Sequence, residues 1–170
     1  ILVPACCIDI DNRVLPPRDL LFQTAPTTYL SKLIVMIVMA DGDPVGDVEQ
    51  LTQLREEYVQ AENAGDIDGV LRMFSDDIVV MPPESPPIKG IEAAKDFFGG
   101  FLDAFTVDIE LASEDVVVDG DLAYDWGTVS GTLEPSGGQP QPVSNTYLLV
   151  YQRDSDGSWR QSKHIWNANE

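Results

Sequence analysis

Residues 54–83, LREEYVQAENAGDIDGVLRMFSDDIVVMPP, are the stretch that decides the fold. An apolar stripe at +3 and +4 spacing runs through its first part and predicts one face of a helix. The stripe consists of Leu51, Leu54, Tyr58 and Ala61. Asp47, with Gln50 three residues later, predicts a capping box at the start of this helix.

The middle of the stretch predicts a break, a short second helix and a strand. Residues 63–65 (Asn-Ala-Gly) end the first helix, because Gly accepts the left-handed conformation favoured at helix C-termini. Asp66 is expected to cap the second helix. Its apolar face consists of Ile67, Val70, Leu71 and Phe74. Asp76-Asp77 predicts a solvated turn, and the β-branched run at residues 78–81 predicts a strand that stops at Pro82-Pro83.

The rest of the chain predicts one more helix and then mostly strands. The helix follows Gly90 and has one apolar face, made of Ile91, Ala94, Phe98, Phe101 and Phe105. The expected strands are Val107–Leu111, Glu114–Val118, Leu122–Leu133, Val143–Gln152 and Ser158–Asn167. Helices followed by a run of antiparallel strands indicate an α+β domain, in which a curved sheet wraps one long helix.

The charge of the chain is strongly acidic and unevenly distributed. The formal net charge of the 170 residues is -19, and residues 41–170 carry all of it. Such a surface repels nucleic acids and anionic membranes, so neither is an expected partner. Lys is scarce and Asp outnumbers Glu, a balance that suggests a halophilic source, with an ordinary acidic protein as the alternative.

Residues 1–40 are predicted to be an N-terminal extension, extended or partly disordered, and residues 41–170 to be the domain. The apolar run Leu33–Ala40 is too short for a membrane span. It fits either a tail or the remnant of a signal peptide, and the tail is favoured because few positive charges precede the run. A cytoplasmic location is therefore expected, with export as the alternative. Cys6 and Cys7 are adjacent, the chain has one His, and no cofactor or metal-binding spacing is present.

Several short motifs carry a resemblance to a known superfamily. They are NAGD at 63–66, FSDD at 74–77, MPP at 81–83, YDWG at 124–127 and IWN at 165–167. The chain resembles the SnoaL-like and ketosteroid isomerase-like proteins of the NTF2-like superfamily, and within it a domain-of-unknown-function branch. The resemblance implies a cystatin-like cone with three N-terminal helices packed on a curved, mostly antiparallel sheet. It also implies a homodimer through the outer sheet face.

In this fold the pocket lies between the concave face of the sheet and the helices. Strand alternation and the resemblance place an aromatic cup there, suited to a small apolar ligand with one oxygen. The expected substrate-binding residues are Met81, Trp126, Tyr147 and Trp166. Asp125 alternates with Trp126 along its strand and is expected to face outward.

Tyr58 and His164 are the expected catalytic residues. Tyr58 matches the oxyanion-hole tyrosine of ketosteroid isomerases. Met81-Pro82 stands at the position of their general-base aspartate and the region 145–147 lacks their second acid, so steroid isomerisation is not expected. His164 is then the candidate proton shuttle. Each residue has a structural alternative, since His164 could be a hydrogen-bonded core residue and Tyr58 could bond a strand carbonyl.

The sequence therefore predicts a small-molecule-binding domain. As an enzyme it would be a cofactor-independent isomerase, cyclase, lyase or dehydratase that uses acid/base chemistry on an apolar carbonyl compound. The alternative is a non-catalytic ligand carrier or a dimerising association module. The feature that separates the two is whether Tyr58 and His164 converge on an open cavity or on a filled core.

Overall fold

The computed structural model describes residues 44–169. The predicted extension at residues 1–40 lies outside the described residues, and so do Cys6, Cys7 and the run Leu33–Ala40. In the described part no helix is long and apolar enough to cross a membrane.

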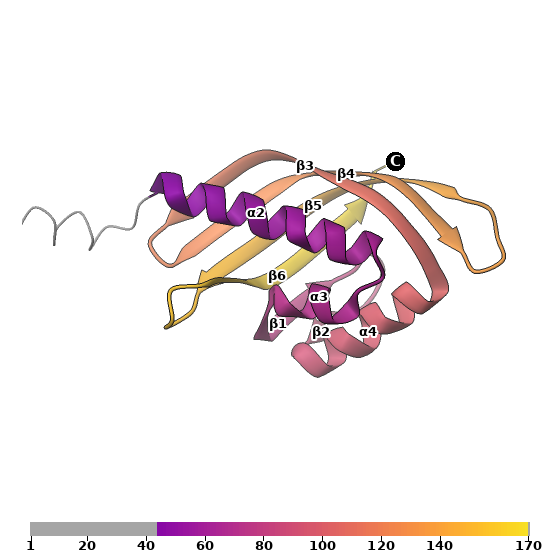
Figure 1. The fold of residues 1–170 in the computed structure, drawn as a ribbon, viewed down its shortest axis with the longest axis horizontal. Helices are drawn as coiled ribbons and strands as arrows, with labels where there is room; N and C mark the ends of the chain where they lie inside the picture. Colours follow the sequence, from indigo (N-terminus) through magenta and orange to yellow (C-terminus); the bar gives the residue numbers. More distant parts are fainter. Residues whose placement is uncertain (1–43, 170) are drawn as a thin grey trace, which may run out of the picture. The chain divides into compact units, whose positions relative to one another are not determined.

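The described residues form helices and strands in an α+β order (Figure 1). The helices are α2 (Pro44–Asn63), α3 (Ile67–Arg72) and α4 (Ile91–Ala104). The strands are β1 (Phe74–Met81), β2 (Ile88–Lys89), β3 (Phe105–Asp119), β4 (Leu122–Pro135), β5 (Gln141–Arg153) and β6 (Trp159–Ala168). Within the described part, α2 and α3 precede the first strand, whereas α4 follows β2.

A single curved sheet holds these six strands in the order β2-β1-β6-β5-β4-β3. Strand β1 runs parallel to β6, and the other neighbouring pairs are antiparallel. The long helix α2 lies across the concave face of this sheet (Figure 1). The predicted α+β architecture with a mostly antiparallel sheet around one long helix is confirmed.

Helix α2 buries the apolar stripe that the sequence predicts. Leu51, Tyr58 and Ala61 are buried, and Leu54 packs at the edge of the core. The helix ends before Gly65, whose φ of 67° lies in the left-handed region. The carboxylate of Asp66 caps α3 by accepting a hydrogen bond from the Gly69 amide at 2.9 Å. The predicted break and the predicted cap are both confirmed.

The predicted capping box at the start of α2 is wrong. Asp47 lies inside the first turn of the helix, and its buried carboxylate contacts residues of the sheet instead of capping the helix. It pairs with Arg153 at 2.7 Å and accepts a hydrogen bond from the Trp159 indole at 3.3 Å. These tertiary partners come from β5 and β6, so local spacing alone does not reveal them.

Two strands are longer than the sequence predicts. Strand β1 begins at Phe74, so Asp76 and Asp77 are exposed strand residues and not a turn. The two short strands expected between residues 107 and 118 are one strand, β3, with an irregularity in its register between Ser113 and Asp115. A bulge of this kind bends the strand without ending it.

Two glycines of β4 let neighbouring strands approach closely. A Cβ atom on Gly127 would lie 2.0 Å from the Ala112 carbonyl oxygen, and one on Gly131 would lie 2.1 Å from that of Asp108. Gly131 also has a φ of 143°. Side chains are therefore not tolerated at these points, where the β3–β4 pair arches over the helices.

The core consists of two apolar clusters. One joins Leu51 of α2 to the inner faces of β3 to β6. The other joins Tyr58 and Ala61 to α3, α4 and β1. The two clusters meet near Trp166, which packs against both.

Candidate functional site

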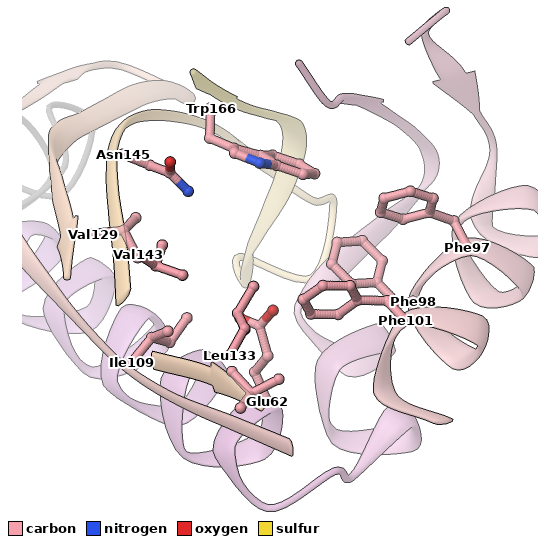
Figure 2. Close-up of a pocket in the computed structure, with 11 residues that line it drawn as sticks. Glu62, Phe97, Phe98, Phe101, Ile109, Val129, Leu133, Val143, Asn145 and Trp166 are labelled. Atoms are coloured by element: carbon pink, nitrogen blue, oxygen red, sulfur yellow. The ribbon is translucent and has the colours of Figure 1, made fainter. Parts of the chain in front are cut away.

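A cavity of about 140 Å³ lies between α4, the end of α2 and the inner face of the sheet. Figure 2 shows its walls. On one side stand Phe97, Phe98 and Phe101 of α4, and on the other stand aliphatic side chains of the strands. The complete lining consists of Glu62, Phe97, Phe98, Phe101, Val107, Ile109, Val129, Leu133, Val143, Asn145 and Trp166.

Glu62 is the ionisable side chain in this lining. It comes from the last turn of α2, and only 6% of it is exposed. Burial raises the pKa of its carboxyl from 4.5 to about 7, and the effect of the Tyr58 hydroxyl opposes part of this rise. A carboxyl in these surroundings changes its protonation state near neutral pH.

The C-terminal end of α2 is attached to the sheet beside Glu62. The Asn63 side chain donates to the Ile109 carbonyl at 2.9 Å and accepts from the Ile109 amide at 2.9 Å. Ile109 itself lines the cavity. This paired contact fixes the last turn of the helix against β3 and so fixes the backbone that carries Glu62.

Tyr58 lies one helical turn before Glu62, on the core side of the cavity. It is buried, and its ring lies 5.2 Å from the His164 ring. Burial first, and then the charge of Glu62, raise the pKa of Tyr58 well above its usual value. The phenol therefore stays protonated and acts as a donor.

His164 sits behind Tyr58 in a filled aromatic environment. Its ring lies 5.9 Å from that of Phe98 and 5.4 Å from that of Trp166, and both contacts are edge-on. Gln161 Oε1 lies 3.0 Å from Nδ1, and because this oxygen can only accept, Nδ1 carries the proton. Burial lowers the pKa of His164 to about 3. The imidazole is therefore neutral at pH 7.

The orientation predicted for Trp126 and Asp125 is wrong. Trp126 points away from the cavity and is 41% exposed, whereas Asp125 is fully buried on the inner face. Asp125 pairs with Arg55 and accepts hydrogen bonds from Ser113 at 2.6 Å and from Tyr147 at 3.0 Å. Three donors from α2, β3 and β5 compensate the buried charge, which explains why it can face inward.

Residues 56–162 match the family model of the SnoaL-like domain. The chain belongs to this family. The match spans more than half of the chain and includes Tyr58, Glu62 and Asn145.

Solved structures of the NTF2-like superfamily share the fold of this SnoaL-like domain. A ketosteroid isomerase-like protein from Erwinia carotovora atroseptica SCRI1043 is 21% identical, with a TM-score of 0.68, over 72% of this chain and 95% of that chain. A candidate dehydratase from the NTF2-like family of Streptomyces avermitilis is 18% identical, with a TM-score of 0.66, over 75% and 99%. A candidate calcium/calmodulin-dependent protein kinase II association domain from Xanthomonas campestris is 25% identical, with a TM-score of 0.57, over 76% and 90%.

The other predicted site residues of the SnoaL-like domain are dispersed. Trp166 lines the cavity, whereas Met81 at the end of β1 does not. Tyr147 is buried and donates its hydroxyl to Asp125. Tyr58 and His164 do converge, but within the core beside the cavity and not on its lining.

Glu62 is the residue that the sequence analysis missed. It follows Ala61 on the buried side of α2 and stands four residues after Tyr58, so an acidic residue on an apolar stripe was the available signal. Asn145 faces the same cavity from β5. Across residues 44–169, no three His, Cys, Asp or Glu side chains gather closely enough to hold a metal ion.

Proposed function

We propose that this SnoaL-like domain binds a small, largely apolar carbonyl compound in the Glu62 cavity and moves a proton on it. The observation that carries the proposal is a buried carboxyl on the wall of a cavity whose other lining residues are apolar except for Asn145. Glu62 takes part in none of the ion pairs found among residues 44–169. A carboxyl kept in such a place without a cation has a stability cost and is typical of acid/base sites.

The proposed chemistry is proton transfer next to a carbonyl group. With a pKa of about 7, Glu62 is present both as base and as acid at neutral pH. As the carboxylate it takes a proton from the carbon beside the carbonyl, and as the acid it returns that proton to another position. Asn145 can donate its amide N–H to the carbonyl oxygen, where negative charge develops. Isomerisation and dehydration are both reactions of this class.

The roles predicted for Tyr58 and His164 change in this proposal. Both lie beside the cavity rather than on its lining, and His164 is neutral with Nδ1 committed to Gln161. Proton transfer by His164 itself stays a prediction, and Glu62 has the better position for it. Trp166 keeps its proposed role as a wall that the ligand contacts.

The size of the cavity limits the ligand. Roughly 150 Å³ of apolar cavity is enough to bind benzene. The 140 Å³ here therefore suits a compound with one ring, such as a cyclic ketone, and a steroid does not fit without opening of the walls.

A thermal-shift screen of single-ring ketones and aldehydes tests binding. The test variant, Val143→Phe, fills the cavity, and the matched control, Val117→Phe, makes the same change on the exposed outer face. A ligand is expected to stabilise the wild type and Val117→Phe but not Val143→Phe. The proposal fails if no compound stabilises the wild type, or if Val143→Phe responds equally.

A second candidate function is a dimerising association module. Four large apolar side chains are exposed in the described part, at Val117, Leu122, Tyr124 and Trp126 of β3 and β4, besides Val45 of α2. Val117, Leu122 and Tyr124 line a shallow apolar hollow on the outer face of the sheet. Apolar patches of this kind are typical of association surfaces, and the occupant proposed here is a second copy of the chain.

A further inference from the structure

We propose that the glycine pair Gly99-Gly100 in the middle of α4 is a hinge, at which the helix bends and opens the Glu62 cavity. As an account of ligand entry, the inference rests on the proposed function of this cavity. The bending itself is a property of the protein without ligand.

The glycine pair has no packing or conformational reason to be glycine. Both residues lie in the interior of α4, and neither has a positive φ. A Cβ atom at either position would meet no atom of another element within 4 Å. Every other glycine between residues 65 and 157 has either a positive φ or a neighbouring atom within 3.2 Å of the place of a Cβ. In this range, Gly99 and Gly100 are therefore the two glycines that the fold alone does not explain.

Two successive glycines weaken the helix that contains them. Glycine loses more backbone freedom than any other residue, so each one disfavours a helix interior about fivefold relative to alanine. Because the space at Gly99 and Gly100 is free, alanine would fit there and stabilise α4. Glycine at these positions costs stability, and the property that it provides in exchange is a point at which the helix bends.

The glycine pair lies where α4 passes from one core cluster to the other. Before the pair, Phe98 belongs to the cluster of α3, α4 and β1, and Phe97 packs against that cluster. After the pair, Phe101 and Leu102 pack against the cluster that joins α2 to strands β3 to β6. A bend between residues 98 and 101 therefore separates the two clusters and leaves the packing within each of them in place.

The cavity lies at this same boundary. Its α4 wall consists of Phe97 and Phe98 on one side of the glycine pair and Phe101 on the other (Figure 2). A bend at the pair moves the Phe101 ring relative to the Phe98 ring and so widens the wall. Such a movement gives a ligand access to Glu62, which is only 6% exposed while the wall is closed.

Labelling of a cysteine placed in the cavity tests the hinge without a ligand. Val129 is buried and lines the cavity. In a chain with Cys6→Ser and Cys7→Ser, Val129→Cys should react with fluorescein maleimide, which is larger than the cavity, only while the wall is open. Its reaction rate is expected to be independent of low urea concentrations. Adding Gly99→Ala and Gly100→Ala is expected to slow the reaction about fivefold for each substitution.

Val80→Cys is the matched control, because Val80 is completely buried on β1 and is not part of the cavity lining. It should react more slowly than Val129→Cys, through global unfolding alone, and its rate should rise with urea. The inference is overturned if Val129→Cys reacts as slowly as Val80→Cys. It is also overturned if the two alanine substitutions leave the rate of Val129→Cys unchanged.

Amide hydrogen exchange of the wild type covers the case in which Val129→Cys does not fold. In an α-helix, the amides of Phe101 and Leu102 bond to carbonyls four residues earlier, across the glycine pair. They are expected to exchange with little dependence on urea, because a bend breaks these bonds without unfolding the domain. If both amides exchanged only with the urea dependence of global unfolding, the hinge would be excluded. Neither measurement uses a ligand, so a failed ligand screen and a failed hinge can be told apart.

Discussion

At the residue scale, the pKa of Glu62 links the stability of the domain to its proposed function. Its folded-state pKa is raised, so the folded protein holds this proton more tightly than the unfolded chain does. The corresponding stability is fully present below pH 4.5 and is lost as the pH rises through about 7. At higher pH the domain therefore bears the cost of an ionised carboxyl in an apolar cavity.

The substitution Glu62→Gln is expected to remove this pH dependence. A pKa shift from 4.5 to about 7 corresponds to about 3 kcal/mol of free energy of unfolding. As the pH rises from 4.5 to 8, the free energy of unfolding of the wild type should therefore fall relative to that of Glu62→Gln, by up to this amount. Urea unfolding at both pH values measures it. Glu56→Gln, an exposed change on the same helix, is the control, and a difference that does not vary with pH would contradict the prediction.

His164 gives the opposite pH dependence. Its folded-state pKa is lowered, so its contribution is fully present above pH 6.5 and is lost as the pH falls toward about 3. Between pH 4.5 and 6.5 the effects of Glu62 and His164 on stability oppose each other. The sequence placed His164 near the site, but only the packed rings around it show that burial keeps it neutral.

At the scale of elements, the buried pair of Arg55 and Asp125 ties α2 to the sheet. The Arg55 side chain is mostly buried and Asp125 is completely so. Serine and tyrosine hydroxyls from β3 and β5 complete the shell around the carboxylate. A buried charge is tolerated here only while its partners stay in place.

The substitution Arg55→Met is expected to destabilise the domain by about 3–5 kcal/mol, because it leaves Asp125 ionised and without its cation. The double variant Arg55→Met with Asp125→Leu should recover much of this loss, since neither charge remains. Denaturant unfolding of the two variants and of the wild type measures the effect. A double variant less stable than Arg55→Met would contradict the interpretation.

Some features of these elements were predictable from the sequence, and others were not. The spacing of Leu51, Tyr58 and Ala61, the break at Gly65 and the cap at Asp66 were predictable because each depends on neighbours in the chain. The inward face of β4 was not predictable. Alternation along a strand divides its residues into two sets, but it does not say which set is buried. The choice depends on Arg55, 70 residues away from Asp125.

The candidate site was only partly predictable for a similar reason. Trp166 was expected at the pocket and lines it, and Phe98 and Phe101 were expected on one helix face. Glu62 escaped prediction because helical periodicity counts apolar residues, and an acidic residue beside the stripe is usually solvated. Its burial results from α4 and β3 closing over the end of α2.

At the scale of the whole molecule, the outer face of the sheet carries the proposal of a homodimer. Trp126 of β4 is exposed there beside Tyr124, in a protein whose net charge is -19. A net charge of this size opposes non-specific association, so an apolar patch that persists on the surface favours a specific contact. Adaptation to salt stays a prediction from the acidic composition.

Light scattering at micromolar concentration is expected to give a dimer for the wild type and a monomer for Trp126→Glu. The new charge would be buried without a partner in the interface. Thr106→Glu adds the same charge at an exposed position near the start of β3 and should remain dimeric. A monomeric wild type, or a dimeric Trp126→Glu variant, would contradict the proposal that the outer face of the sheet is an association surface.

The proposed function requires that Glu62 exchanges a proton with a carbonyl compound held in the cavity. Deuterium incorporation tests it most directly, with single-ring ketones incubated in D₂O and the protons beside the carbonyl followed by NMR. The wild type is expected to exchange these protons faster than buffer does, and Glu62→Gln to return the rate to that of buffer, with Glu56→Gln unchanged. A wild type that binds such ketones without speeding exchange, or a Glu62→Gln variant that exchanges as fast as the wild type, would contradict the claim.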